Sequence, residues 1–181
     1  TAAVSETAEL LLDRGADPNR RDAKAAVRPF SFGYTAMEWA AERATLEFIT
    51  LLLNRGAEVD PGGVSSQASL RGALGNSPEV VDLLINSGLD IDGADPGDGS
   101  TVLHGAANFP HPEKVEMLLT RGAAVDVRTH DGRTPLHRAA ERNRSARVAT
   151  MLVDAGATVN ARDASAITPL GYALERGKEK V

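Results

Sequence analysis

Residues Arg133–Ala140 read RTPLHRAA, and this stretch decides the fold because it recurs along the chain. Related stretches start at Thr35 (TAMEWAA), Ala68 (ASLRGAL), Thr101 (TVLHGAA) and Thr168 (TPLGYAL). The five starts at 35, 68, 101, 134 and 168 are therefore 33 or 34 residues apart. A fixed period of this length is typical of proteins built from stacked structural repeats.

A second motif follows the same period. It is an apolar segment that ends at a glycine: Gly15, Gly56, Gly88, Gly122 and Gly156. Apolar residues in it recur at helical spacing, as at Val80, Val81 and Leu84, so each segment predicts a helix that a left-handed glycine ends. Thr134 and Pro135 are typical of a second helix start, and Ser77-Pro78 and His111-Pro112 of the glycine-ended one. Helices of about ten residues are unstable alone, so they must stack on their neighbours.

The TPLH stretch and the period together resemble the ankyrin repeat. The resemblance covers essentially all 181 residues and implies an all-α solenoid. Each implied unit has a β-turn finger, an inner helix, a short turn and an outer helix. The implied single domain 1–181 divides into a partial repeat 1–22, a finger insertion 23–32, repeats 33–65, 66–98, 99–131 and 132–165, and a partial repeat 166–181.

His137 invites a catalytic interpretation, which the repeat argues against. His104 holds the same place one unit earlier, and Glu38, Arg71 and Gly171 hold it elsewhere. The resemblance implies that this histidine forms hydrogen bonds around the turn, and we predict that role here.

Composition narrows the function classes. The net charge of −5 argues against nonspecific binding to nucleic acid or to anionic membranes. The chain has no cysteine, and no apolar run reaches the length of a membrane span. Motifs such as GxSxG and HExxH are absent from the sequence. We therefore expect no catalysis by the chain itself, no cofactor and no metal site.

Two fingers depart from the pattern. Residues 23–32 (AKAAVRPFSF) insert eight extra residues in the first finger, which is either a binding loop or a tolerated surface loop. The finger at 90–98 carries Asp90, Asp92, Asp95 and Asp98. A calcium loop is one interpretation, but the EF-hand spacing is absent, so we favour a solvated hairpin.

Aromatic residues give the first clue to a partner site. Phe30, Phe32, Tyr34 and Trp39 cluster in or beside the first finger, and we predict that they anchor a partner. We add to this site Glu42, Arg43, Phe109 and Tyr172. The alternative for Trp39 and Tyr172 is packing between adjacent inner helices.

Arginines give the second clue. Residues 128–147 contain six arginines against Asp131 and Glu141, a local charge of +4, which leaves −9 for the rest of the chain. The repeat register places Arg133, Arg138 and Arg142 on the finger and inner helix. An acidic or phosphorylated segment could bind these guanidinium groups. A solvated face with pairing to Glu141 is the alternative.

The predicted function is a protein–protein interaction module that binds a protein or peptide in the concave groove of fingers and inner helices. The alternative is a regulatory or substrate-recruiting region of a larger enzyme, and a third interpretation is a spacer within a longer array. The chain starts without methionine, so we expect a piece of something longer. We expect a monomer in an intracellular setting. The resemblance also implies that Asn19 and Asn160 are candidates for hydroxylation.

Overall fold

The computed structural model describes residues 2–21, 35–43, 45–59, 77–109, 111–142 and 146–178. These residues form helices joined by turns, and none of them lies in a β-strand. The chain divides into two compact units, residues 1–89 and 90–181. An all-α repeat fold is confirmed.

The first unit contains α1 (Ala2–Asp13), α2 (Ala36–Arg43), α3 (Leu46–Asn54) and α5 (Pro78–Asn86). Helix α2 packs against α3, and α3 packs against α5. The most deeply buried side chains are Met37, Ala41, Ile49, Leu52, Val80, Val81 and Leu84. In α2, α3 and α5 they lie on one face of the helix, as the apolar spacing predicts.

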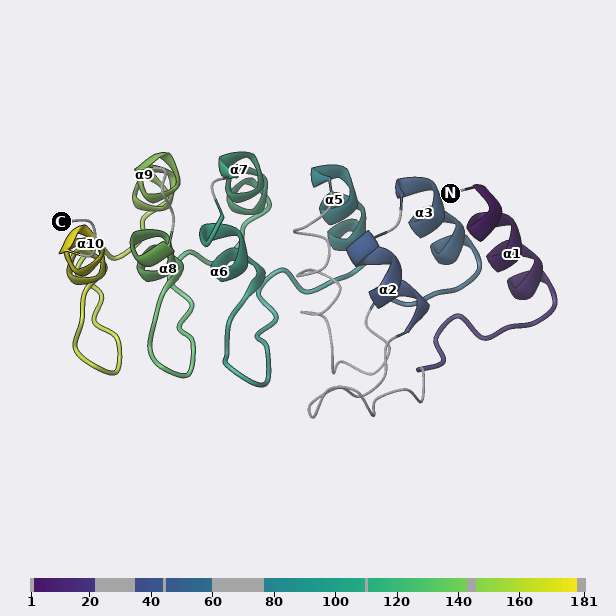
Figure 1. Ribbon diagram of the computed structural model, residues 1–181, viewed down its shortest axis with the longest axis horizontal. Coiled ribbons are helices and arrows are strands. Elements are labelled where there is room, and N and C mark those ends of the chain that lie inside the picture. Colours follow the sequence, from purple (N-terminus) through teal and green to yellow (C-terminus); the bar gives the residue numbers. More distant parts are fainter. Residues whose placement is uncertain are drawn as a thin grey trace. The chain divides into compact units, whose positions relative to one another are not determined.

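The second unit contains α6 (Val102–Ala107), α7 (Pro112–Thr120), α8 (Pro135–Arg142), α9 (Ala146–Asp154) and α10 (Pro169–Lys178). Figure 1 shows α6, α8 and α10 in one row and α7 and α9 in a second row beside it. Contacts link α6 to α8, α8 to α10, and α7 to α9, while α6–α7 and α8–α9 form the helix pairs. The inner and outer helix layers that the resemblance implies are therefore both present in this unit.

Local chemistry explains the helix ends. The glycines at 15, 56, 88, 122 and 156 all adopt positive φ, from 81° to 97°, so the predicted left-handed ends are confirmed. Pro78 and Pro112 begin α5 and α7, where a missing N–H is tolerated. Ser77 occupies the N-cap position of α5 in extended conformation.

The repeat histidines hold turns together, as predicted. The Thr134 N–H donates to Nδ1 of His137 at 3.1 Å, and Nε2 of the same ring donates to the Ile167 carbonyl, also at 3.1 Å. His104 makes the same two kinds of bond, with the Thr101 N–H and the Arg133 carbonyl. Each imidazole thus joins the turn of its own repeat to the finger of the next.

In α2, Glu38 holds the place of the histidine and makes the first of the two contacts, the one with the turn of its own repeat. Its Oε2 accepts the Thr35 N–H at 2.8 Å, while the Glu38 N–H bonds to the Thr35 hydroxyl at 3.2 Å. This reciprocal arrangement is a capping box. The carboxylate also pairs with Arg21 at 3.3 Å.

Three side chains that lie four residues after a repeat glycine connect their finger to the next repeat. Asp92 accepts the Ala124 N–H at 2.8 Å, and Asp126 accepts the Thr158 N–H at 3.0 Å. Asn19 accepts the Glu58 N–H at 2.7 Å and also donates to the Gly56 carbonyl at 3.0 Å.

The acidic finger forms the favoured hairpin. The Asp95 N–H donates to the Ser100 carbonyl at 2.8 Å, which closes the turn. The carboxylates of Asp90, Asp95 and Asp98 each accept the N–H two residues further on. These local bonds are typical of Asx turns.

Candidate partner-binding site

The structure places only part of the predicted aromatic cluster. Phe30, Phe32 and Tyr34 lie outside the described residues, as does the whole insertion 23–32. Trp39 lies on α2 and is 46 % exposed. Glu42 and Arg43 end the same helix, but their side chains lie outside the described set.

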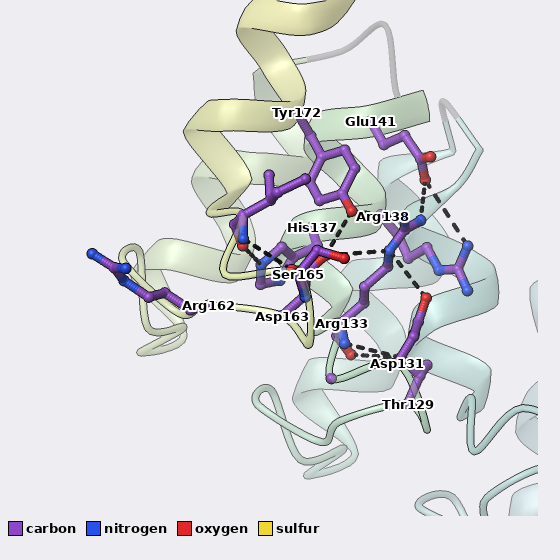
Figure 2. A network of polar contacts seen from close by, with 12 residues as sticks. Thr129, Asp131, Arg133, His137, Arg138, Glu141, Arg162, Asp163, Ser165 and Tyr172 are labelled. Atoms are coloured by element: carbon purple, nitrogen blue, oxygen red, sulfur yellow. Dashed lines mark hydrogen bonds and ion pairs between the residues drawn. The ribbon is translucent and has the colours of Figure 1, made fainter.

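In the second unit the structure brings three of the predicted residues into one polar network, Arg133, Arg138 and Tyr172, which Figure 2 shows from close by. Arg142 joins them through Glu141. Phe109 follows the C-terminal end of α6 and is 53 % exposed. Phe109 and Arg142 hold equivalent positions, because each lies eight residues after the repeat threonine. They therefore lie at, or just beyond, the C-terminal ends of adjacent inner helices.

Arg133 lies at the centre of this network. Its Nη1 is 3.1 Å from Glu141 Oε2, and its Nη2 donates to the Tyr172 hydroxyl at 2.7 Å. Its Nε is 3.1 Å from Asp131 Oδ2, an ion pair without hydrogen-bond geometry. Burial lowers the pKa of Arg133, but the facing Glu141, Tyr172 and Asp131 outweigh burial and raise it. The charge of Arg133 is thus already neutralised within the fold.

Tyr172 lies on α10 and its side chain is buried, as packing between adjacent inner helices would require. Its hydroxyl donates to Asp163 Oδ2 at 2.6 Å, and the Arg133 guanidinium lies 4.5 Å from the centroid of its ring. The ring also meets the edge of His137 at a centroid distance of 6.0 Å. The Tyr172 hydroxyl therefore joins α10 to two successive fingers, through Arg133 and Asp163.

Asp163 anchors the finger side of the network. Its Oδ1 accepts the N–H groups of Ser165 and Ile167, each at 2.9 Å. Burial raises the pKa of Asp163. Hydrogen bonds from Tyr172 and from these amides lower the pKa by more, so the net shift is downward. Asp163 remains ionised at neutral pH as a result.

Glu141 is shared by three guanidinium groups. Arg133 is nearest at 3.1 Å, whereas Arg142 lies at 3.6 Å and Arg138 at 3.9 Å. The Arg142 side chain is 61 % exposed. Arg133 makes the closest pair, and Glu141 supplies a single negative charge to the three guanidinium groups.

Two further arginines border the network. Arg128 donates to the carbonyls of Gly132 and Arg162, at 3.0 Å and 2.8 Å, and both arginines are exposed. Five arginines (128, 133, 138, 142 and 162) against three carboxylates (131, 141 and 163) leave a local charge of +2. This is less than the +4 counted over residues 128–147 because Arg144 and Arg147 are not part of the network, while Arg162 and Asp163 of the next finger cancel each other.

Sequence reasoning missed Asp163 and Arg162 as members of this site. Both lie about one period after Arg128 and Arg133, in the next finger. The repeat register alone could have suggested their proximity.

A comparison with protein families identifies the repeat. A model described as ankyrin repeats (3 copies) matches residues 66–163 and 103–181. The chain belongs to the ankyrin-repeat family. Ankyrin repeats are protein-interaction modules without catalysis of their own.

Several characterised proteins are similar to the chain. It is 32 % identical over 136 residues to the E3 ubiquitin-protein ligase KEG of Arabidopsis thaliana, covering 71 % of the chain and 8 % of that protein. It is 33 % identical over 139 residues to human ankyrin repeat and SOCS box protein 6, covering 72 % and 31 %. It is 35 % identical over 104 residues to the Drosophila melanogaster ankyrin repeat and KH domain-containing protein mask, covering 56 % and 3 %. The chain spans less than a third of each of these relatives.

No helix within the described parts of this ankyrin-repeat chain has the length and apolar character needed to cross a membrane.

Proposed function

We propose that the chain binds an acidic or phosphorylated segment of a partner protein at the arginine edge, defined here as Arg138 and Arg142 on α8. The observation that carries the proposal is the single Glu141 carboxylate facing three guanidinium groups. Arg133 takes the closest pair, so an incoming carboxylate or phosphate would complete the neutralisation of the other two. Arg133 then serves to position the edge.

Phe109 provides the apolar part of the proposed site. It is exposed on the adjacent repeat, at the position equivalent to Arg142. Gly105 holds the place on α6 that Arg138 holds on α8, so α6 presents no side chain there. An apolar residue next to an acidic one in the partner fits this combination.

The aromatic cluster at the first finger stays a second candidate contact. It comprises Phe30, Phe32, Tyr34 and Trp39, and Glu42 and Arg43 follow it on the same helix as Trp39. The exposure of Trp39 supports it, because a large exposed aromatic side chain is typical of interface anchors.

We further propose that the chain acts as a binding region within a larger protein, which is how a substrate-recruiting role would arise. Relatives named as E3 ubiquitin-protein ligases, one from Arabidopsis thaliana and one from Caenorhabditis elegans, support this. We propose no catalysis by the chain itself and no role in nucleic-acid or membrane binding, in line with its net charge of −5. Family membership supports an intracellular setting.

The test uses a fluorescein-labelled octaglutamate peptide, with octalysine as the opposite-charge probe, and fluorescence anisotropy. We expect wild type to bind octaglutamate in a salt-sensitive manner and to ignore octalysine. The variant R138Q/R142Q should lose at least about tenfold in affinity, the equivalent of about 1.4 kcal/mol. The control R121Q/R147Q removes the same charge from exposed arginines associated with the outer helices.

Equal binding by both double variants would show that net charge alone governs the interaction, and the arginine edge would be rejected. A pull-down with F109A and W39A then separates the two apolar contacts. Loss with W39A but not with F109A would favour the first finger over the second unit.

A further inference from the structure

The arginine edge has a glycine beside it on the neighbouring inner helix. Helices α6 and α8 are in contact, and Figure 1 shows them next to each other in the same row. Gly105 of α6 holds the position that Arg138 holds on α8, each four residues after the repeat threonine. On α2 and α10 this position carries a large aromatic side chain, Trp39 or Tyr172. Gly105 has no side chain, so it leaves room for a group of a binding partner.

Phe109 borders this glycine. The backbone stays helical at Asn108, with φ −73° and ψ −21°, so Phe109 lies about one turn after Gly105. Phe109 is 53 % exposed. On α8, Arg142 follows Arg138 by four residues, which makes the two arginines neighbours on the helix surface. A glycine and an exposed aromatic ring on one helix are therefore next to a pair of arginines on the adjacent helix.

The two arginines lie at different depths. The Arg138 side chain is 17 % exposed, whereas the Arg142 side chain is 61 % exposed. Burial is the largest cause that lowers the pKa of His104 in α6, and the charge of Arg138 lowers this pKa as well. Arg138 therefore forms the deeper part of the arginine edge, close enough to α6 for its charge to act there. A short anionic side chain meets Arg142 first, and an extended one also reaches Arg138.

The charge of the surrounding network suits a dianion. Five arginines against three carboxylates leave a local charge of +2. Within the described residues neither Arg138 nor Arg142 donates a hydrogen bond from its guanidinium group, and each approaches Glu141 only as an ion pair, at 3.9 Å and 3.6 Å. A phosphate monoester carries a charge of about −1.5 to −2 at pH 7 and has three acceptor oxygens. A carboxylate supplies one charge and two oxygens, so phosphate fits the two guanidinium groups better.

We propose that the residue bound at the arginine edge is a phosphotyrosine of the partner protein. Its ring lies over Gly105 and against Phe109, and its phosphate accepts hydrogen bonds from Arg138 and Arg142. This inference rests on the proposed binding of an anionic segment at the arginine edge, and it names the residue that is bound.

The distance between the helices favours tyrosine over the other phosphorylated residues. Axes of packed helices are about 8–10 Å apart, so one side chain that contacts both α6 and α8 must be long. Phosphoserine and phosphothreonine carry the phosphate on the oxygen next to Cβ, and they have no ring to place on Gly105. In phosphotyrosine a whole aromatic ring separates the phosphate from Cβ. A single residue then satisfies the apolar and the charged part of the site together.

Fluorescence anisotropy with four labelled peptides tests the proposal. The peptides share Gly-Ser flanks and differ at the central residue, which is phosphotyrosine, tyrosine, phosphoserine or glutamate. We expect the phosphotyrosine peptide to bind at least about tenfold more tightly than each of the other three. R138Q/R142Q should lose at least about tenfold in affinity for it, and R121Q/R147Q should bind it like wild type.

Variants of α6 test the contact with the ring. G105L fills the space over the glycine and should weaken binding of the phosphotyrosine peptide at least about tenfold, while binding of octaglutamate stays within about twofold. G105A is the matched control, because it adds one methyl group and favours the helix, and it should stay close to wild type. F109A should weaken binding of the phosphotyrosine peptide about fivefold and leave the phosphoserine peptide unchanged. Circular dichroism verifies that each variant is folded, and F109A carries the test if G105L is not.

Equal affinity for the phosphotyrosine and phosphoserine peptides would overturn the inference. Binding of the phosphotyrosine peptide that both G105L and F109A leave unchanged would overturn it as well. Octaglutamate binding that depends on Arg138 and Arg142, without a preference for phosphotyrosine, would reject the phosphotyrosine and keep the proposed function. If the wild-type chain binds none of the anionic peptides, both are rejected.

Discussion

Replacement of His137 by alanine offers the sharpest test of how the repeats are held together. The side chain is fully buried, and it bridges the Thr134 N–H and the Ile167 carbonyl. Alanine leaves both backbone groups without their partner, at about 1–3 kcal/mol each, and opens a cavity. Partial rescue by water reduces the sum, so we expect a loss of about 3 kcal/mol in the free energy of unfolding. That is a large share of the stability of an ordinary domain.

Glutamine at the same position separates the two halves of the bridge. In α2 the Glu38 side chain accepts the N–H of its capping threonine, so Gln at position 137 can accept the Thr134 N–H likewise. It does not restore the bond to the Ile167 carbonyl. We expect H137Q to lose about half as much as H137A, near 1.5 kcal/mol.

Urea unfolding followed by circular dichroism measures both losses. His111 supplies the control, because it is exposed at the start of α7, and H111A should change stability by less than about 0.5 kcal/mol. A loss below about 1 kcal/mol for H137A would refute the bridge. Equal losses for H137A and H137Q would show that the bond to the next finger carries the whole effect.

Three further changes test the packing between repeats. Burial is the largest cause that lowers the pKa of His104 and His137, so below pH 6.5 the unfolded chain binds protons that the folded chain does not. Stability should therefore be complete above about pH 6.5 and fall below it, with urea midpoints at pH 7.5 and 5.5 as the measurement; a flat profile would contradict this. Tyr172→Phe keeps the ring but removes a hydroxyl bonded to two charged groups, so thermal unfolding should show a loss of about 1.5–3 kcal/mol, and an unchanged midpoint would count against the network. Gly132→Ala places a Cβ 2.9 Å from the backbone of the next finger, whereas Gly122→Ala has the same sign of φ but open space, so the first should cost at least about 1 kcal/mol more in urea unfolding.

Much of the fold could be predicted because its signals are local. A glycine with positive φ ends a helix whatever lies nearby, and a proline in the first turn begins one. The 33-residue period then places equivalent residues on the same face. This is why the hairpin at 90–98 was predictable from residues close in sequence, whereas the role of His137 followed from the resemblance to the ankyrin repeat.

The candidate site was harder to predict. The sequence places Arg133, Arg138 and Arg142 together, but it does not say which of them Glu141 neutralises. The structure shows that Arg133 takes that carboxylate and that Tyr172 is buried. Side-chain rotamers choose between such partners, and charge counting does not include them.

The sequence by itself determined the repeat, its two helices and the points where they begin and end, because short-range backbone chemistry sets these. Only the tertiary structure decided that Asp163 of the next finger approaches Arg133 and that Tyr172 is buried with its hydroxyl on Arg133. Those features depend on contacts between residues one repeat apart, where stacking brings together side chains that the linear chain keeps about 30 residues away from each other.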